Sequence, residues 1–177
     1  MPSTQQVRTV TLTTTEAAVL ALLAIEGERS PYELTKAVEH SIGHIWSPAK
    51  SGLYATLPRL AKSRLAQRRG RHYRISAAGR AALDDWLTTV EPGARETFFL
   101  KLFVGGLTTP DVLAEHVEQF LADIEQRLDV MRAIAPTNSN TGHDWYHGHL
   151  LRYGIERAEH EFEWAAGVGR ALRRGPQ

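Results

Sequence analysis

The sequence predicts a mainly α-helical protein with one small β-hairpin wing, built as a winged helix-turn-helix followed by a C-terminal helical dimerisation domain. Three observations lead there. Three short helical segments precede a segment of two-residue alternation, a fourth helix follows, and two long apolar periodicities fill the second half. With 177 residues, of which 42% are hydrophobic, the chain suffices for two small domains. We expect them at residues 1–90 and 91–177.

The first two helices are marked by their caps. Thr13, Thr14 and Thr15 offer hydroxyl caps ahead of an apolar run that closes at Gly27. Ser30 and Glu33 form a capping box around Pro31, which fits the first position of a second helix. We expect that helix to end at Gly43, before a turn at residues 46–48.

A third helix is expected near residues 50–63. Its buried stripe consists of Leu53, Leu57 and Leu60. Ser51, Tyr54 and Arg59 therefore lie away from the core. Pro58 lacks an N–H and should kink this helix, at a cost of about 3 kcal/mol unless the helix starts late.

After the third helix, apolar residues recur at every second position instead of every third or fourth. Residues 65–69 and 72–76 flank Gly70 and Arg71, and Tyr73 and Ile75 alternate with polar neighbours, as in a hairpin with one solvated face. Ser76 is positioned to cap a fourth helix over residues 77–89.

The second half is predicted to be helical. A dense apolar segment spans residues 95–104, a long helix runs from Pro110 to Ile134, and a polar linker at 135–142 leads to a last helix over 144–173. The two long helices form an antiparallel pair whose apolar stripes exceed what one pair can bury. We therefore expect a homodimer.

Charge is distributed unevenly along the chain. Residues 1–90 carry 12 Lys and Arg against 7 Asp and Glu (+5), and residues 91–177 carry 9 against 13 (−4), which sum to +1. Between residues 40 and 83 there are nine Lys and Arg and no Asp or Glu. Such a block favours a polyanionic partner.

Because cysteine is absent, disulfides, thiolate metal sites and a cysteine nucleophile are excluded.

The basic block falls on the third helix and the hairpin, the two elements with which a winged helix contacts double-stranded DNA. We assign Tyr32, Lys50, Arg69 and Arg71 to phosphates, and Ser51, Tyr54 and Arg59 to the groove. His72, beside the hairpin tip, completes the predicted DNA-binding set.

Several segments resemble the PadR family of bacterial transcriptional regulators. They are SPYELTKAVEHSIGHIWSPAKSGLYATLPRLAKSRLAQ (30–67), HYRISAAGRAALDDWL (72–87) and LKLFVGGL (100–107). The resemblance implies a dimeric winged-helix repressor whose C-terminal helices form the dimer and whose effector, where one exists, is an aromatic small molecule. The chain departs from the family pattern in having Pro31 instead of glycine, Pro58 later than the usual proline after Leu-Tyr, and a short wing.

The last helix contains residues that suit an effector. Trp145, Tyr146 and Tyr153 could line an aromatic pocket and Arg152 could meet a ligand carboxylate, although aromatic residues at helical spacing also suit a dimer core. His143 and His147, four residues apart, together with His149 and Asp144 leave a metal-responsive regulator open as an alternative, but we assign no metal site and no cofactor.

The sequence thus predicts a ligand-responsive repressor that binds a palindromic operator as a homodimer. A winged-helix module for protein–protein interaction is the alternative from another class. No nucleophile, base and orienting group can be assembled from local motifs, so we expect no enzymatic activity. No apolar run is long enough to span a membrane and no secretion signal is recognisable, so we expect a cytoplasmic protein with no membrane partner.

Overall fold

The computed structural model describes residues 11–40, 49–134 and 143–175, and for residues 143 and 144 only the backbone. The chain divides into two compact units. The first contains residues 1–89 and 99–108, and the second contains residues 90–98 and 109–177. The predicted Gly43 helix end, the turn at residues 46–48 and the linker at 135–142 lie outside the described residues.

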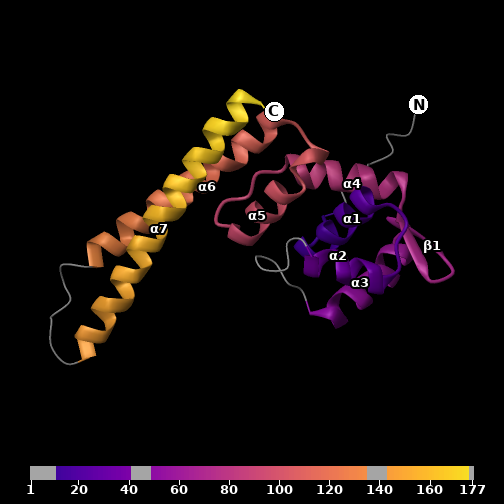
Figure 1. Cartoon of the computed structure of the whole chain (residues 1–177), viewed down its shortest axis with the longest axis horizontal. Helices are drawn as coiled ribbons and strands as arrows, with labels where there is room; N and C mark the ends of the chain where they lie inside the picture. Colours follow the sequence, from indigo (N-terminus) through magenta and orange to yellow (C-terminus); the bar gives the residue numbers. More distant parts are fainter. Residues whose placement is uncertain (1–10, 41–48, 135–142, 176–177) are drawn as a thin grey trace, which may run out of the picture. The chain divides into compact units, whose positions relative to one another are not determined.

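The first unit has the element order of a winged helix (Figure 1). Its elements are α1 (Thr14–Glu26), α2 (Pro31–His40), α3 (Lys50–Lys62), β1 (Ala66–Arg69), β2 (His72–Ile75) and α4 (Ala77–Thr88). Helix α1 is the centre of the core, because every residue from Ala17 to Leu23 is buried. Thr13 and Glu16 cap its start and Gly27 ends it with a φ of 76°, as the sequence predicts.

Helix α3 buries Leu53, Leu57 and Leu60, which confirms the predicted stripe. Pro58 lies inside this helix, which begins at Lys50 and continues to Lys62. A late helix start is therefore not how the chain accommodates this proline.

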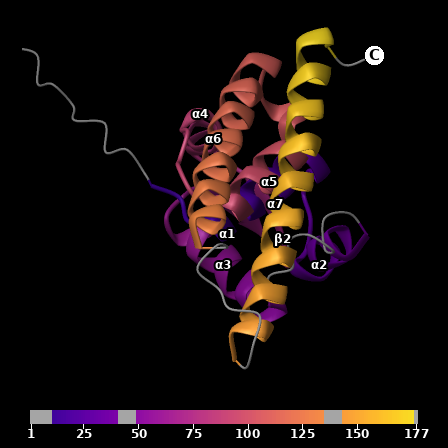
Figure 2. The ribbon, with the colours of Figure 1, turned by 90° about the vertical axis from the view of Figure 1, so that its left-hand side faces the viewer.

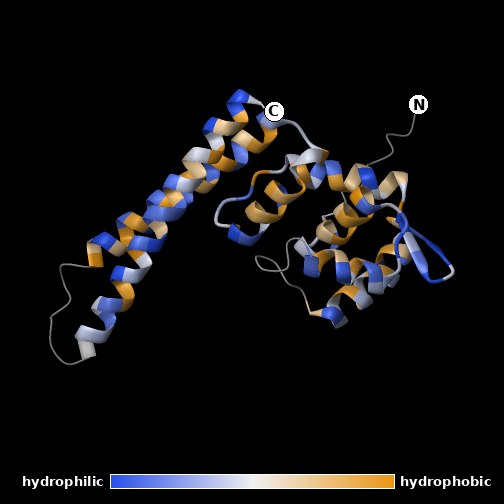
Figure 3. Cartoon of the chain, in the orientation of Figure 1, coloured by the Kyte–Doolittle hydropathy of each residue, from blue (hydrophilic) through white to orange (hydrophobic). Residues whose placement is uncertain are grey.

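The two strands form an antiparallel hairpin, and Arg69 pairs with His72 across a two-residue turn. Gly70 adopts a φ of 59°, a left-handed value that costs glycine little. Tyr73 and Ile75 are buried while His72 and Arg74 are exposed, so the predicted alternation is confirmed. The hairpin is strongly hydrophilic in its outer part (Figure 3).

Helix α5 (Arg95–Phe103) and the 3₁₀ turn η1 (Gly105–Leu107) lead out of a loop into the long helices. Leu100 and Val104 are buried in the core of the first unit. Lys101 is also buried there, and its ammonium donates to the carbonyl of Thr89 and lies 4.7 Å from the centroid of the Trp86 ring. A single division near residue 90 thus omits a segment that completes the N-terminal core.

The second unit is dominated by α6 (Pro110–Ile134) and α7 (His143–Arg174), which lie side by side in both views (Figures 1 and 2). Their pairing is antiparallel, since Gly169 lies against Val117 and Gly154 lies against Met131. Leu113, Val117, Phe120, Ile124 and Leu128 are buried, whereas Leu151, Ile155, Phe162 and Leu172 of α7 are only partly buried. None of the helices in the described ranges is long and apolar enough to cross a membrane.

Candidate nucleic-acid interface

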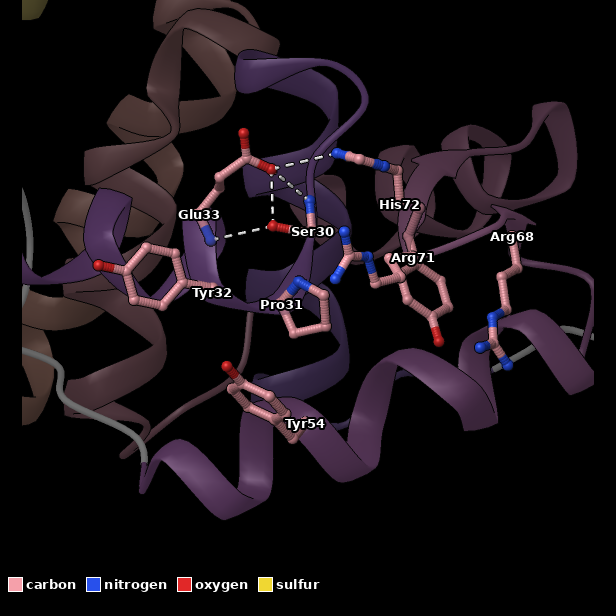
Figure 4. Close-up of a pocket in the computed structure, with 9 residues that line it drawn as sticks. Ser30, Pro31, Tyr32, Glu33, Tyr54, Arg68, Arg71 and His72 are labelled. Atoms are coloured by element: carbon pink, nitrogen blue, oxygen red, sulfur yellow. Dashed lines mark hydrogen bonds and ion pairs between the residues drawn. The ribbon is translucent and has the colours of Figure 1, made fainter.

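A hollow of about 680 Å³ opens on the first unit between the start of α2, the outer side of α3 and the wing (Figure 4). It is lined by Ser30, Pro31, Tyr32, Glu33, Tyr54, Arg68, Arg71, His72 and Tyr73. The lining contains tyrosine rings, guanidinium groups, one imidazole and one carboxylate. Cations beside aromatic rings can hold an anion whose neighbouring groups are partly apolar, as in a sugar-phosphate backbone.

The α2 side of the hollow is held by a capping box. The Glu33 carboxylate accepts hydrogen bonds from the Ser30 N–H and hydroxyl, both at 2.7 Å, while the Glu33 N–H donates to the Ser30 hydroxyl. Tyr32, at the second position of the helix, is 63% exposed. The predicted cap thus also fixes the position of a charged group in the hollow.

The wing is joined to the residue before α2. Arg29 and Tyr73 exchange two backbone hydrogen bonds of 3.0 and 2.8 Å, which form a short antiparallel bridge beside the hairpin. This bridge connects two walls of the hollow by main-chain bonds.

Arg68 reaches the hollow from β1. Its Nε donates to the carbonyl of Gly70 at 2.9 Å, and its guanidinium lies 5.9 Å from the centroid of the ring of Tyr73, its cross-strand partner. These contacts hold the guanidinium at the hairpin tip.

Tyr54 forms the α3 side. It follows the buried Leu53 by about 100° around the helix axis, so its ring lies beside the buried stripe and is 46% exposed. Arg59 lies about 140° further around the axis than Tyr54, and its guanidinium donates to the Thr56 hydroxyl at 3.1 Å. The two side chains therefore occupy opposite flanks of the outer face of α3.

Carboxylates of α2 meet the basic block, although the block itself contains none. Glu39 pairs with Lys36 at 2.8 Å and with Lys50 at 3.0 Å. Hydrogen bonds from these two ammonium groups lower the pKa of Glu39 to about 2. Glu33 lies 3.6 Å from the Nε2 of His72. The Lys50 ammonium is thus paired with a carboxylate of α2.

The structure brings four of the eight predicted DNA-binding residues to the hollow: Tyr32, Tyr54, Arg71 and His72. The other four are exposed elsewhere, with Lys50 and Ser51 in the first turn of α3, Arg59 near its end and Arg69 at the end of β1. All eight are exposed, as a contact surface requires.

Sequence reasoning did not select Arg68 or Glu33 for this site. The hairpin register could have identified Arg68, because a residue opposite Tyr73 shares a face with it. Glu33 was recognised only as a capping residue. Its proximity to His72, 39 positions later in the chain, follows from the bridge between the wing and α2.

The predicted effector residues lie near the start of α7. Trp145, Tyr146 and Tyr153 are 48%, 64% and 62% exposed, and Arg152 is also exposed. The Trp145 ring packs against Tyr146 and His149, with centroid distances of 5.0 and 4.3 Å. In a single chain these residues form an open surface, so enclosing a ligand requires a second surface.

Acidic residues of α7 pair across the helices. Glu161 is nearly buried and accepts from Arg95 at 3.0 Å, with Arg127 at 3.6 Å, while Glu159 pairs with Arg132 at 2.8 Å. Among the side chains that the structure describes, which exclude His143 and Asp144, no group of three could hold a metal ion.

Comparison with known proteins matches both halves of the chain. A family model described as "Virulence activator alpha C-term" matches residues 94–173, a range that includes α5, α6 and nearly all of α7. The chain is similar to the negative transcriptional regulator PadR of Bacillus subtilis, with 24% identity over 170 residues that cover 85% of this chain and 93% of the relative.

Solved structures give similar coverage. The crystal structure of the transcriptional regulator PadR from Bacillus subtilis is 22% identical, covers 90% of this chain and 99% of that one, and has a TM-score of 0.44. The Vibrio cholerae virulence activator AphA is 20% identical, covers 91% and 99%, and has a TM-score of 0.40. Bacillus subtilis PadR has also been solved with operator DNA and with p-coumaric acid.

Proposed function

We propose that the chain is a transcriptional regulator of the PadR family, since it is similar to the negative transcriptional regulator PadR of Bacillus subtilis over most of its length, and that it binds double-stranded DNA as a homodimer and represses transcription from a palindromic operator. The observation that carries this proposal is the gathering of Tyr32, Tyr54, Arg68, Arg71 and His72 around one hollow beside the exposed face of α3. The role is one of binding, and we expect no catalysis. Action on chromosomal DNA would place the protein in the cytoplasm.

The two elements have different tasks in this proposal. Ser51, Tyr54 and Arg59 on α3 enter the major groove, where hydroxyl and guanidinium groups can reach base edges. Arg69 and Arg71 of the wing, together with Lys50 and Tyr32, contact phosphates and release condensed counterions, so affinity falls steeply with salt. Phosphate contacts set the register, and contacts from α3 select the sequence.

The dimer is supported by apolar surface on the second unit. Large side chains at one end of the α6–α7 pair are exposed: Val130, Ile134, Trp145, Tyr146, Leu150 and Tyr153. A second copy that packs there would bury both sets of residues symmetrically. Two recognition helices related by a twofold axis then require a palindromic site.

The same exposed surface of the α6–α7 pair supports regulation by a small aromatic molecule. Bacillus subtilis PadR has been solved with p-coumaric acid. In this chain Trp145, Tyr146, Arg152 and Tyr153 supply aromatic rings and a cation, and pairing with a second copy could enclose them. A ligand that binds one dimer geometry more tightly than another would shift the spacing of the two DNA-binding units and release the operator.

The decisive experiment is a titration of the labelled upstream region of the protein's own gene with the full-length chain, followed by fluorescence anisotropy. A scrambled duplex of equal length is the control, and p-coumaric acid is added as the probe of regulation. We expect tighter binding to the upstream region, a steep fall in affinity with salt and weaker binding with the probe. Affinity for both duplexes that is negligible at moderate salt would favour the protein–protein module instead.

A further inference from the structure

His72 lies between groups of opposite charge at the edge of the hollow. Its Nε2 is 3.6 Å from a Glu33 carboxylate oxygen, and about half of each side chain is exposed (Figure 4). Arg68 and Arg71 lie on the same side of the hollow as the imidazole. An anion that enters between these guanidinium groups would therefore leave His72 with a negative charge on either side.

Glu33 keeps its charge at neutral pH. The hydroxyl and N–H of Ser30 donate to its carboxylate, and His72 and Arg29 stand nearby, so the pKa of Glu33 lies below its usual range. A fixed negative charge at this position repels a phosphate unless a cation stands between them. Besides Glu33, the charged and titratable groups around His72 are its cross-strand partner Arg69, together with Arg29, Arg68, Arg71 and the phenols of Tyr32, Tyr54 and Tyr73.

We propose that His72 is a proton-coupled phosphate ligand: a DNA phosphodiester enters the hollow against Arg68 and Arg71, and His72 binds it as the imidazolium ion between phosphate and Glu33. The proposal rests on the proposed DNA-binding function. No covalent bond changes, and each protomer takes up at most one proton from solvent as it binds.

The physical reason is linkage. An ordinary histidine has a pKa near 6.5, and each neighbouring anion favours its charged form. DNA adds a second anion beside the ring, so binding favours the imidazolium ion. Affinity then rises as pH falls.

The test uses the full chain and a labelled random-sequence duplex of about three helical turns, because a backbone contact needs no operator. Affinity is measured from pH 5.5 to 8.5 at fixed ionic strength. We expect the wild-type affinity to fall as the pH rises, by at most tenfold per pH unit for each protomer engaged. His72→Gln should bind with a nearly flat profile over the same range.

Two further variants separate this role from a general effect of pH. Glu33→Gln retains a capping side chain, since glutamine also serves in a capping box, but removes the charge. It should bind more tightly than wild type at pH 8 and have a shallower slope. His160→Gln changes an exposed histidine of α7 and should keep the wild-type profile. Calorimetry in two buffers of different ionisation enthalpy should count the proton directly.

The outcomes distinguish a failure of the His72 inference from a failure of the proposed DNA-binding function. If wild type and His72→Gln bind DNA with the same pH slope and the same proton uptake, His72 is not the coupled ligand, although DNA binding stands. If the wild-type chain binds no duplex at any pH, the proposed function and this inference both fail.

Discussion

Gly79 is the residue on which the junction between the wing and α4 depends. The Ser76 hydroxyl accepts from the Gly79 N–H at 2.9 Å and lies within hydrogen-bond distance of the Leu65 carbonyl. A Cβ on Gly79 would stand 2.0 Å from that carbonyl oxygen. Only glycine allows the first turn of α4 to approach the chain at the start of the wing this closely.

We therefore expect Gly79→Ala to lower the free energy of unfolding by about 2–3 kcal/mol, because the backbone carbonyl must move. The thermal midpoint should fall by about 10 °C. Gly52→Ala is the matched control, since a Cβ there meets nothing within 4 Å and helix propensity should make the change neutral or stabilising. Equal melting of the two variants would contradict this account of the junction.

Tyr54 combines partial packing with an exposed hydroxyl at the hollow. Tyr54→Phe should leave the thermal midpoint nearly unchanged and weaken operator binding by about 1 kcal/mol, the net value of one hydrogen bond. Tyr54→Ala should reduce both stability and affinity. A Phe variant that melts lower but binds normally would assign the hydroxyl to the fold instead of to DNA.

Among the elements, α2 forms ion pairs with both α3 and the wing, the two elements proposed to contact DNA. Glu39 pairs with the first residue of α3, and Glu33 with a residue of the wing. Both ion pairs are exposed, so each contributes little to stability and can be exchanged for a phosphate. Helix α2 thus packs in the core and also supplies two carboxylates, Glu33 and Glu39, whose cationic partners can bind a phosphate instead.

The wing itself should act on the DNA backbone. Arg68→Ala and Arg71→Ala should each weaken binding to operator and random duplexes by similar factors and reduce the slope of log affinity against log salt by about one. Arg173→Ala, an exposed change near the end of α7, should leave the slope unchanged. Unequal losses on the two duplexes would mean that the wing reads bases.

At the scale of the whole molecule, the first unit is discontinuous in sequence. Residues 99–108 return to it after the chain has entered the second unit. Leu100 and Val104 are 2% and 1% exposed in its core. A fragment that ends at Thr89, where the fourth helix closes, would lack these side chains.

We expect residues 1–108 to fold as a monomer and residues 1–89 to be less stable by about 3–5 kcal/mol, the burial energy of Leu100 and Val104. Thermal melting compares the two fragments, and light scattering compares both with the full chain, which should be a dimer. A full-length chain that is monomeric at micromolar concentration, or a dimeric 1–108 fragment, would contradict dimerisation through α6 and α7.

Many structural features of this protein can be predicted from short segments of its sequence. The caps at Thr13, Ser30 and Ser76 and the alternation at Tyr73 and Ile75 depend on partners within a few residues, or on which face meets the core. These interactions are present in the sequence itself, and the structure confirms them. The exposure of Tyr54 and His72 follows from helix and strand period in the same way.

Contacts between distant segments depend on the tertiary structure. Glu33 meets His72, Glu39 meets Lys50, and Arg95 meets Glu161 across 66 positions. The return of residues 99–108 to the first core is of the same kind. The helices and strands, and the faces they bury or expose, can be predicted from short stretches of sequence, because each is set by hydrogen bonds and periodicity over a few residues. Which charges face one another depends on how the packed elements close on each other in space, and no local pattern encodes that.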